Sequence, residues 1–516
     1  MRGSRKPAEA VVIRVGGALM PETISQQDLE RYFWGAAVLL RGYIDSSDYK
    51  QFIFPLLYFK RVCDVYDEET AEVVQEYGQG VGDNFAEYHR FTIPKDAHWK
   101  DVREKTTDVG VAIQNAMREL EKSNPERLAG IFGDAPWTNK SRLSDETLRD
   151  LIEHFSSETL TLSHVPQDEL GQGYEYLIKK FADDSGHTAA EFYTNRTLVK
   201  LMTLILDPKE GESIYDPTCG TGGMLLVAAL QLKEQGKEFR SLKLYGQDIN
   251  LITSSIARMN LFLHGIDDFE IVRGDTLAQP AFLKNDKLRQ FDLVLANPPY
   301  SINKWNRDAF AADPYGRNLY GVPPQGRADY AFFQHIIKSM NKKTGRCAIL
   351  FPHGVLFRDA ELDIRKKMIE ADIIECVLGL GPKLFYNSPM YSCVVVCRMS
   401  KLPEQKGKIL FIDASKEVAI EKTQSFLEDP HRKKILYAYQ SFKDIEGFAK
   451  VVTNKEILTH NANLSVQMYV RSSTEQICAE CETLEDCIEN WEVSTETFKK
   501  TYVDLVSSLG EVGFHE

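Results

Sequence analysis

Short apolar stretches alternate with helical stretches from residue 213 to residue 413, and this alternation constrains the fold more than any other feature. The expected strands are residues 213–215, 242–246, 270–272, 291–296, 346–351, 373–378, 392–398 and 408–413, and the expected helices between them are residues 223–234, 252–264, 330–340 and 362–371. Strands that alternate with helices predict an α/β fold whose sheet is mostly parallel and is covered on both faces. Ligands of such a sheet bind beyond the carboxyl ends of its strands.

The chain before residue 213 has a different pattern. Helical spacing of apolar residues over 26–40, 47–67, 109–122, 145–155 and 168–181 predicts an all-α beginning. We expect its aromatic residues to form a core, although some of them could face a partner. These residues are Tyr32, Phe33, Trp34, Phe52, Phe54, Tyr58 and Phe59.

The length of 516 residues exceeds what one hydrophobic core usually serves, so we expect several domains. The expected boundaries are a poorly ordered leader at 1–21, a helical domain at 22–160, the sheet-bearing catalytic domain at 161–425 and a C-terminal region at 426–516. Residues 474–509 are charged and amphipathic, which suits docking to a partner helix or an ordinary surface helix.

Net charge and cysteine content limit the possible partners and the cellular compartment of the protein. The charges sum to 62 − 75 = −13, so the field of the whole molecule does not attract nucleic acid, and a local basic groove or a basic partner must do so. The nine cysteines are scattered, which predicts reduced thiols and a cytoplasmic protein. No apolar run approaches the ~20 residues of a membrane span. Cys478, Cys481 and Cys487 lack a second ligand pair, so we expect no metal site.

The segment Asn297-Pro298-Pro299-Tyr300 follows the expected strand at 291–296. Two successive prolines supply no backbone N–H, so this loop presents carbonyl oxygens, an amide and a phenol at the strand end. Such groups suit an amine substrate with a flat ring. A Pro-rich turn without chemistry is the alternative interpretation.

A glycine-rich turn, residues 216–223, closes the first strand and opens a helix. Its glycines let the backbone approach a ligand at the helix N-terminus. Asp216 precedes them, and a carboxylate repels pyrophosphate but suits an ammonium or sulfonium group. This charge favours S-adenosylmethionine over NAD as the cofactor, with Thr218, Cys219 and Gly220 beside it.

Two further acids follow at strand ends. Asp248 ends the second strand, where a carboxylate can accept both ribose hydroxyls of the cofactor. Asp275 ends the third strand and could accept the exocyclic amine of an adenine ring. Each residue alone is more often a cap or a turn former, but the series at successive strand ends argues for a site.

These residues resemble the modification subunits of type I restriction-modification systems, which are amino-methylating DNA methyltransferases that use S-adenosylmethionine. The resemblance covers nearly the whole chain, from the helical opening to residues 463–470. It rests on Glu191-Phe192-Tyr193-Thr194, residues 216–223, Asp248, Asn297-Pro298-Pro299-Tyr300, residues 329–335 and residues 408–413.

The resemblance implies a Rossmann-like methyltransferase sheet with an all-α N-terminal domain and a helical C-terminal tail. It also implies adenine N6 in double-stranded DNA as the target, and contact of Glu191, Phe192, Tyr193 and Thr194 with the methionine part of the cofactor. The implied partners are a specificity subunit bound by two copies of this chain and a restriction subunit in the larger complex. Asn195 and Gln467-Met468 depart from the family pattern, which leaves loop rigidity and the role of the latter pair open.

We expect the Asn297 side-chain oxygen and the Pro298 carbonyl to accept the two N6 hydrogens, while Tyr300 stacks on the extruded base. A cytosine N4 amine would fit the same loop, and only the resemblance favours adenine. Methylation of a protein glutamine or an RNA base is a second enzymatic hypothesis. An inactive scaffold is a third, against which the intact acid series argues.

Overall fold

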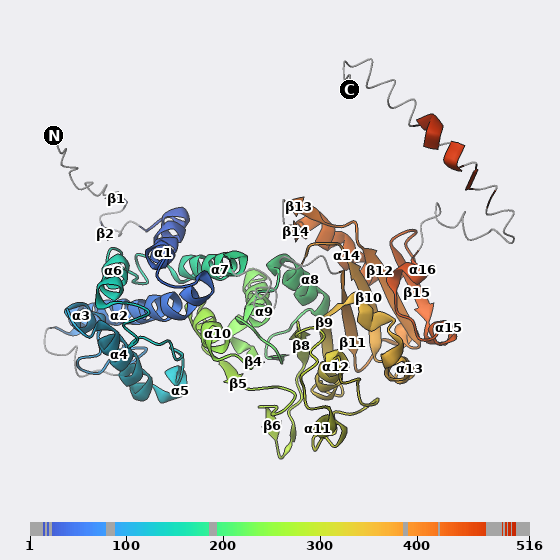
Figure 1. The fold of residues 1–516 in the computed structure, drawn as a ribbon, viewed down its shortest axis with the longest axis horizontal. Coiled ribbons are helices and arrows are strands. Elements are labelled where there is room, and N and C mark those ends of the chain that lie inside the picture. The colour runs from blue at the N-terminus through green and yellow to red at the C-terminus, as the bar shows by residue number, and fades with distance from the viewer. Residues whose placement is uncertain are drawn as a thin grey trace.

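The computed structural model describes residues 14–15, 18–19, 23–78, 88–184, 193–384, 391–421 and 424–470, together with residues 488, 491–492, 494–496 and 498–501. In Figure 1 the helices of the first 184 residues gather toward one side, most strands of the main sheet lie on the other, and β4 and β5 lie between them beside α10. Most of the expected leader, most of residues 474–509, and Cys478, Cys481 and Cys487 lie outside the described residues. No described helix is long and apolar enough to cross a membrane.

The main sheet has nine strands in the order β15-β12-β10-β11-β9-β8-β3-β4-β5. Strands β5, β4, β3, β8 and β9 pair in parallel, whereas β11 pairs antiparallel with both β9 and β10. The expected α/β fold with a mostly parallel sheet is therefore confirmed. The strands are β3 (Ser213–Asp216), β4 (Lys243–Asp248), β5 (Phe269–Arg273), β8 (Leu293–Ala296), β9 (Arg346–Pro352), β10 (Ile374–Leu380), β11 (Ser392–Arg398), β12 (Lys408–Ala414) and β15 (Ala449–Thr453).

Each face of the sheet has its own core, because successive residues of a strand point to opposite faces. Leu293 and Leu295 of β8 belong to one buried cluster, and Val294 and Ala296 belong to the other. Helices pack on both faces of the sheet and complete these two cores. On the first face they are α8 (Arg196–Leu206), α9 (Gly223–Glu234) and α14 (Asp429–Ser441), and on the second they are α12 (Asp329–Lys338) and α13 (Leu362–Glu370).

The strand order reverses at β3. From β3 the chain builds β4 and β5 on one side, and it then returns to place β8 on the other side of β3. The loops that follow β3 and β8 therefore leave neighbouring strands in different directions, which opens a crevice at their carboxyl ends.

The N-terminal helices pack around the long helix α2, whose aromatic side chains fill the core. Of the seven aromatic residues expected there, all but the partly exposed Trp34 are buried. The core interpretation of these residues is therefore confirmed. The helices are α1 (Gln26–Leu40), α2 (Tyr49–Tyr77), α3 (Trp99–Arg103), α4 (Val109–Ser123), α5 (Pro125–Leu128), α6 (Asp145–Phe155) and α7 (Gln167–Asp184).

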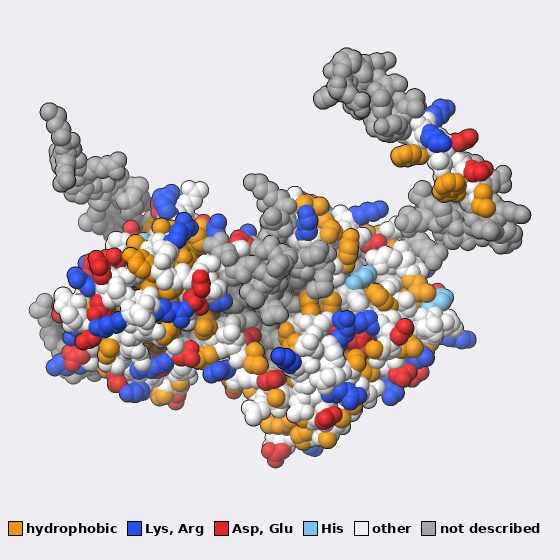
Figure 2. Space-filling view, in the orientation of Figure 1, with side chains coloured by type: hydrophobic (Ala, Val, Ile, Leu, Met, Phe, Trp, Pro, Cys, Tyr) orange, Lys and Arg blue, Asp and Glu red, His pale blue; other side chains and the backbone are white. Residues whose placement is uncertain are grey.

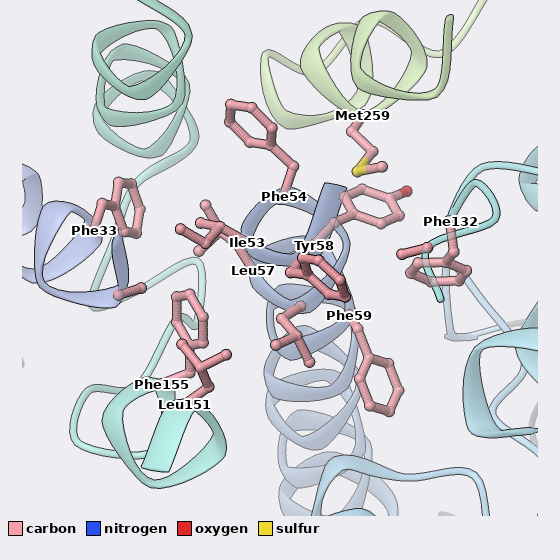
Figure 3. Close-up of a cluster of buried hydrophobic side chains, with 14 of the residues drawn as sticks. Phe33, Ile53, Phe54, Leu57, Tyr58, Phe59, Phe132, Leu151, Phe155 and Met259 are labelled. Carbon is pink, nitrogen blue, oxygen red and sulfur yellow. The ribbon is translucent and has the colours of Figure 1, made fainter. Parts of the chain in front are cut away.

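This helical core extends onto the sheet-bearing part of the chain through α10 (Leu251–Leu263). Ile256, Met259 and Leu263 of α10 belong to the same buried cluster as the aromatic residues of α2. Figure 3 shows Met259 reaching toward Tyr58 and Phe54. The two parts of the molecule thus share one continuous core at this helix.

Several elements differ from the sequence expectation. Helix α2 continues to Tyr77 instead of ending near residue 67, because the added turns contain good helix formers such as Glu and Ala although few of them face the core. Helices α8 and α14 and strand β15 were not expected. Strand β15 is a short edge strand that pairs only with β12, so it carries little alternation for a sequence pattern to report.

Replacing Phe54 by Ala tests the shared core. Phe54 has no exposed surface, so Phe54→Ala should lower the free energy of unfolding by about 3–5 kcal/mol, measured by chemical denaturation followed by circular dichroism. Phe357→Ala is the matched control, because Phe357 is 45% exposed and should cost much less. Equal losses in the two variants would contradict this account of the core.

Candidate functional site

A pocket lies at the crevice between the carboxyl ends of β3 and β8. Three separate segments of the chain line it: the residues before α8, the turn between β3 and α9, and the residue after β8. Its lining residues are Thr194, Arg196, Asp216, Thr218, Cys219, Gly220, Thr221, Gly223, Met224 and Asn297. The structure thus brings six of the expected site residues together, namely Thr194, Asp216, Thr218, Cys219, Gly220 and Asn297.

Asp216 is a buried carboxyl, and among the described residues no cation forms an ion pair with it. It is 2% exposed, and its Oδ1 accepts a hydrogen bond of 3.0 Å from the Thr218 backbone N–H. Burial raises the pKa of Asp216 to about 8, with Asp248 as a further repulsive charge. A desolvated carboxyl of this kind gains most from a positively charged ligand.

A second group in the pocket also lacks a partner. Among the described residues, the buried Thr218 Oγ1 has no hydrogen-bond partner, and it belongs to a residue that lines the pocket. A buried hydroxyl without a partner costs about 1–3 kcal/mol. The site therefore suits a ligand that brings both a positive charge and a hydrogen-bonding group.

The glycine-rich turn shapes the floor of the pocket. Gly220 and Gly222 have φ values of 53° and 76°, the left-handed region that glycine adopts most easily. A Cβ added to Gly223 would lie 1.8 Å from Nη1 of Arg196, so only glycine leaves room for this guanidinium.

Asp248 fixes this turn from the neighbouring strand. Its Oδ2 accepts from the Gly220 backbone N–H at 3.0 Å, and its Oδ1 accepts from the Asn250 backbone N–H at 2.9 Å. Burial raises the pKa of Asp248 to about 6. Asp248 thus lies beside the pocket lining, and its role toward a ribose stays a prediction.

Thr194 joins the two sides of the pocket. Its Oγ1 accepts a hydrogen bond of 3.0 Å from Nδ2 of Asn297. Tyr193 precedes it and is buried under the guanidinium of Arg196, whose central carbon lies 4.6 Å from the ring centroid. Glu191 and Phe192 lie outside the described residues.

Arg196 and Glu175 were not anticipated from the sequence. Nε of Arg196 donates to Glu175 Oε2 at 2.6 Å, and Nη2 donates to Glu175 Oε1 at 3.1 Å. Asn260 of α10 also donates to Glu175, at 2.8 Å. Arg196 follows Thr194 by two residues, and this closeness in sequence could have indicated that Arg196 lines the pocket. Its ion pair with Glu175 could not be predicted, because no local pattern connects the two residues.

The loop after β8 has a defined internal arrangement. The Tyr300 hydroxyl donates to Oδ1 of Asn297 at 2.8 Å, and the Tyr300 ring packs against the core of the first sheet face. An amide oxygen has two lone pairs, so Asn297 Oδ1 can accept another hydrogen. Pro298 is buried beside it and has no N–H to compete. Stacking of Tyr300 on a base stays a prediction.

Asp275 lies outside the pocket lining. Its exposed carboxylate accepts from the backbone N–H groups of Leu277 at 2.9 Å and Ala278 at 3.1 Å, which is the behaviour of a turn former. The adjacent Thr276 donates to the Pro217 carbonyl at 2.6 Å and so ties this turn to the end of β3. A role for Asp275 toward adenine stays a prediction.

Within the described residues, no group of three or more His, Cys, Asp and Glu side chains is arranged to hold a metal ion.

Cys219 lines the pocket, and burial raises the pKa of its thiol well above the usual value. Cys219 is therefore a thiol at neutral pH, and the thiolate that nucleophilic attack requires is absent.

Family models and known proteins match the chain over most of its length. The N-6 DNA Methylase family matches residues 165–477, and the HsdM N-terminal domain matches residues 29–155. The MjaVIII methylase subunit of a type I restriction enzyme from Methanocaldococcus jannaschii is 31% identical, over 87% of this chain and 79% of its own. The HindI methylase subunit from Haemophilus influenzae is 29% identical, over 74% of this chain and 91% of its own.

A solved structure agrees with these sequence matches. The type I restriction-modification methyltransferase subunit from Streptococcus thermophilus superposes with a TM-score of 0.75 and 30% identity, over 87% of this chain and 100% of its own. The expectations for the sheet, the cofactor and the amino-methylating activity are thereby confirmed. The chain belongs to the methylase subunits of type I restriction enzymes, S-adenosylmethionine-dependent enzymes that methylate adenine N6 in DNA and so protect host DNA from restriction.

Proposed function

We propose that Asn297, Pro298 and Tyr300 act on the adenine, while Asp216, Asp248 and the Tyr193-Thr194 segment hold the cofactor. The observation that carries this proposal is the hydrogen bond of 3.0 Å between Asn297 and Thr194, because it joins the loop after β8 to the segment before α8. A shift of either segment would strain or break this hydrogen bond and so disturb the other segment. The two reactants would then meet over neighbouring strand ends.

The residues of the pocket fit the cofactor by their chemistry. Among the described residues, the Asp216 carboxyl forms no ion pair with a cation and the Thr218 hydroxyl has no hydrogen-bond partner. Asp216 would face the positive end of the cofactor, and Asp248 would accept from its ribose hydroxyls. When bound, the cofactor supplies a methyl group that its sulfonium makes electrophilic.

Asn297 and Pro298 would prepare the target amine. The lone pair of adenine N6 is delocalised into the ring, so the amine is a poor nucleophile until its hydrogens are drawn out of the ring plane. The free lone pair of Asn297 Oδ1 and the Pro298 carbonyl can accept those two hydrogens. The methylated amine is acidic enough to lose its proton afterwards, so the residues need not include a strong base.

Tyr300 would support the base once it leaves the helix. Extrusion of a base costs a few kcal/mol, and stacking on an aromatic ring returns about 1–3 kcal/mol. The Tyr300 hydroxyl already donates to Asn297 Oδ1, so the same residue would also orient the amide.

Sequence recognition would come from a partner. The chain carries a net charge of −13, and acidic and basic side chains are interspersed on the face that Figure 2 shows. Residues 301–328 follow Tyr300 directly, include the short helix α11 (Arg307–Ala311), and are too few to contact a long DNA site. We therefore assign target choice in double-stranded DNA to a specificity subunit bound by two copies of this chain, with a restriction subunit in the larger complex.

We also propose limits for the domains of the chain. We keep a helical domain at 22–160 and a catalytic domain that begins at 161. Strand β15 and helix α14 lie within residues 426–516, yet β15 pairs with β12 in the main sheet and α14 packs on its first face. Partner docking is therefore assigned to the residues after 470. A cytoplasmic location accords with the six described cysteines, all buried and free.

Asn297→Ala tests the assignment at the amine. Loss of the amide oxygen should lower methyl transfer to DNA by about 100-fold or more, measured with labelled S-adenosylmethionine and the assembled enzyme. Cofactor affinity by calorimetry should change by less than about tenfold, because the two hydrogen bonds that are lost, to Thr194 and from Tyr300, are both neutral and neither is made to the cofactor. Asn341→Ala is the control, since Asn341 precedes β9 and so lies at the amino ends of the strands, away from the pocket. Transfer at the normal rate by Asn297→Ala would refute the assignment.

Cofactor binding should depend on pH through Asp216. With a pKa of about 8, Asp216 is mostly protonated at pH 6, and a cationic ligand prefers its ionised form. Affinity for S-adenosylmethionine should therefore rise with pH by up to about tenfold per unit between pH 6 and 8, with proton release seen by calorimetry in buffers of different ionisation enthalpy. Asp216→Asn should bind more weakly and lose this slope. A slope that persists in Asp216→Asn would assign the titration to another group.

A further inference from the structure

A second cavity lies away from the active site, between α2 of the helical region and the end of α10. Its volume is about 260 Å³, close to the lower end of the range for small-molecule sites. Its lining shares no residue with the active-site pocket. The residues that distinguish it are Tyr58, Arg61, Arg90, Phe91, Arg127, Arg240 and Phe262.

The cavity contains a buried phenol without a hydrogen-bond partner. Tyr58 is 2% exposed, and among the described residues its hydroxyl has no partner. Figure 3 shows Tyr58 between Met259 and Phe132, with apolar groups on both sides of its ring. The ring centroids of Tyr58 and Phe132 lie 5.9 Å apart. These neighbours offer no oxygen or nitrogen acceptor, and Tyr58 lines the cavity, so a ligand or a solvent molecule in the cavity could supply one.

Four arginines give the cavity a positive character in an acidic protein. Arg61 is buried and held in place, because its Nη1 donates to the carbonyls of Leu160, Thr161 and Val165 at 2.6, 2.8 and 3.0 Å. Arg90 forms an ion pair of 3.2 Å with Glu69.

The other two arginines, Arg127 and Arg240, are exposed, and Asp267 is the one acid in the lining. Burial raises the pKa of the Tyr58 hydroxyl, and among the nearby charges Arg258 and Arg127 lower this pKa whereas Asp267 raises it. Among the lining residues arginines therefore outnumber acids, and the exposed Arg127 and Arg240 suit an anion with several acceptor oxygens.

Aromatic rings form another part of the wall. Phe91 and Phe262 meet edge to face with centroids 6.1 Å apart, and Phe262 lies 6.4 Å from the Tyr58 ring. Rings beside guanidinium groups are the combination that holds a flat base and its phosphate. A free phosphate has no flat group that could contact these rings.

We propose that this cavity binds a nucleoside phosphate. Arg127 and Arg240 contact the phosphate, the Tyr58 hydroxyl donates to one of its oxygens, and the base lies against Phe91 and Phe262. The backbone of duplex DNA is a poorer occupant, because a continuous double helix cannot reach a phenol that is 2% exposed.

Helix α10 connects this cavity to the active site. Phe262 and Leu263 line the cavity, while Asn260 on the same helix donates to the Thr221 carbonyl in the glycine-rich turn at 3.1 Å. An occupant of the cavity would therefore contact the same helix that donates a hydrogen bond to the turn lining the cofactor pocket.

The test is a binding titration on the full chain saturated with S-adenosylhomocysteine, so that the adenosine part of the cofactor site is filled. The probes are guanosine monophosphate, cytidine monophosphate and inorganic phosphate, followed by calorimetry. We expect saturable binding of the nucleotides that is tighter than that of inorganic phosphate. Arg127→Ala and Arg240→Ala should each weaken it by about tenfold or more, whereas Arg149→Ala, an exposed arginine on α6, should leave it unchanged.

Tyr58→Phe separates a ligand contact from a packing role. Removing an unpartnered buried hydroxyl should leave the melting temperature of the free protein unchanged or higher, while the nucleotide affinity falls by about threefold to tenfold. A lower melting temperature with unchanged affinity would overturn the role of this hydroxyl.

Three results would overturn the proposed ligand. The first is no saturable nucleotide binding at millimolar concentration, and the second is equal affinity for inorganic phosphate and nucleotides. The third is a set of variants that weaken binding of a short DNA duplex without affecting nucleotides, which would assign the arginines to the DNA backbone.

Discussion

The reversal of strand order at β3 is the constraint on which the active site depends. It places the ends of β3 and β8 side by side, so that Asp216 and Asn297 line one pocket although many residues separate them. The hydrogen bond from Asn297 to Thr194 then adds a third segment. A sheet with a single winding direction would send these loops the same way and leave no crevice.

Desolvation gives the groups of this pocket their chemistry. The Asp216 carboxyl and the Cys219 thiol are both buried, and burial raises the pKa of each. For the carboxyl this creates a preference for a cationic ligand, and for the thiol it removes the nucleophile. The same physical effect therefore favours direct methyl transfer and disfavours a covalent enzyme intermediate.

Helix α10 links the helical region to this chemistry. Its apolar side chains complete the core around α2, and its Asn260 donates both to Glu175 and to the carbonyl of Thr221. Glu175 in turn holds Arg196 over Gly223. Packing between the two parts of the molecule and the shape of the cofactor pocket thus depend on one helix, which also borders the arginine-lined cavity.

The sequence by itself determined the succession of strands and helices, the aromatic core of α2 and the polar residues at strand ends, because periodicity and residue type act locally. Only the tertiary structure decided that Arg196 pairs with Glu175, that Asn297 bonds to Thr194, and that Tyr300 packs on the sheet core. The pairing of strand β15 with β12 and the cavity at Tyr58 were likewise decided by the tertiary structure. Each depends on which distant segments meet, and a local pattern carries no information about that.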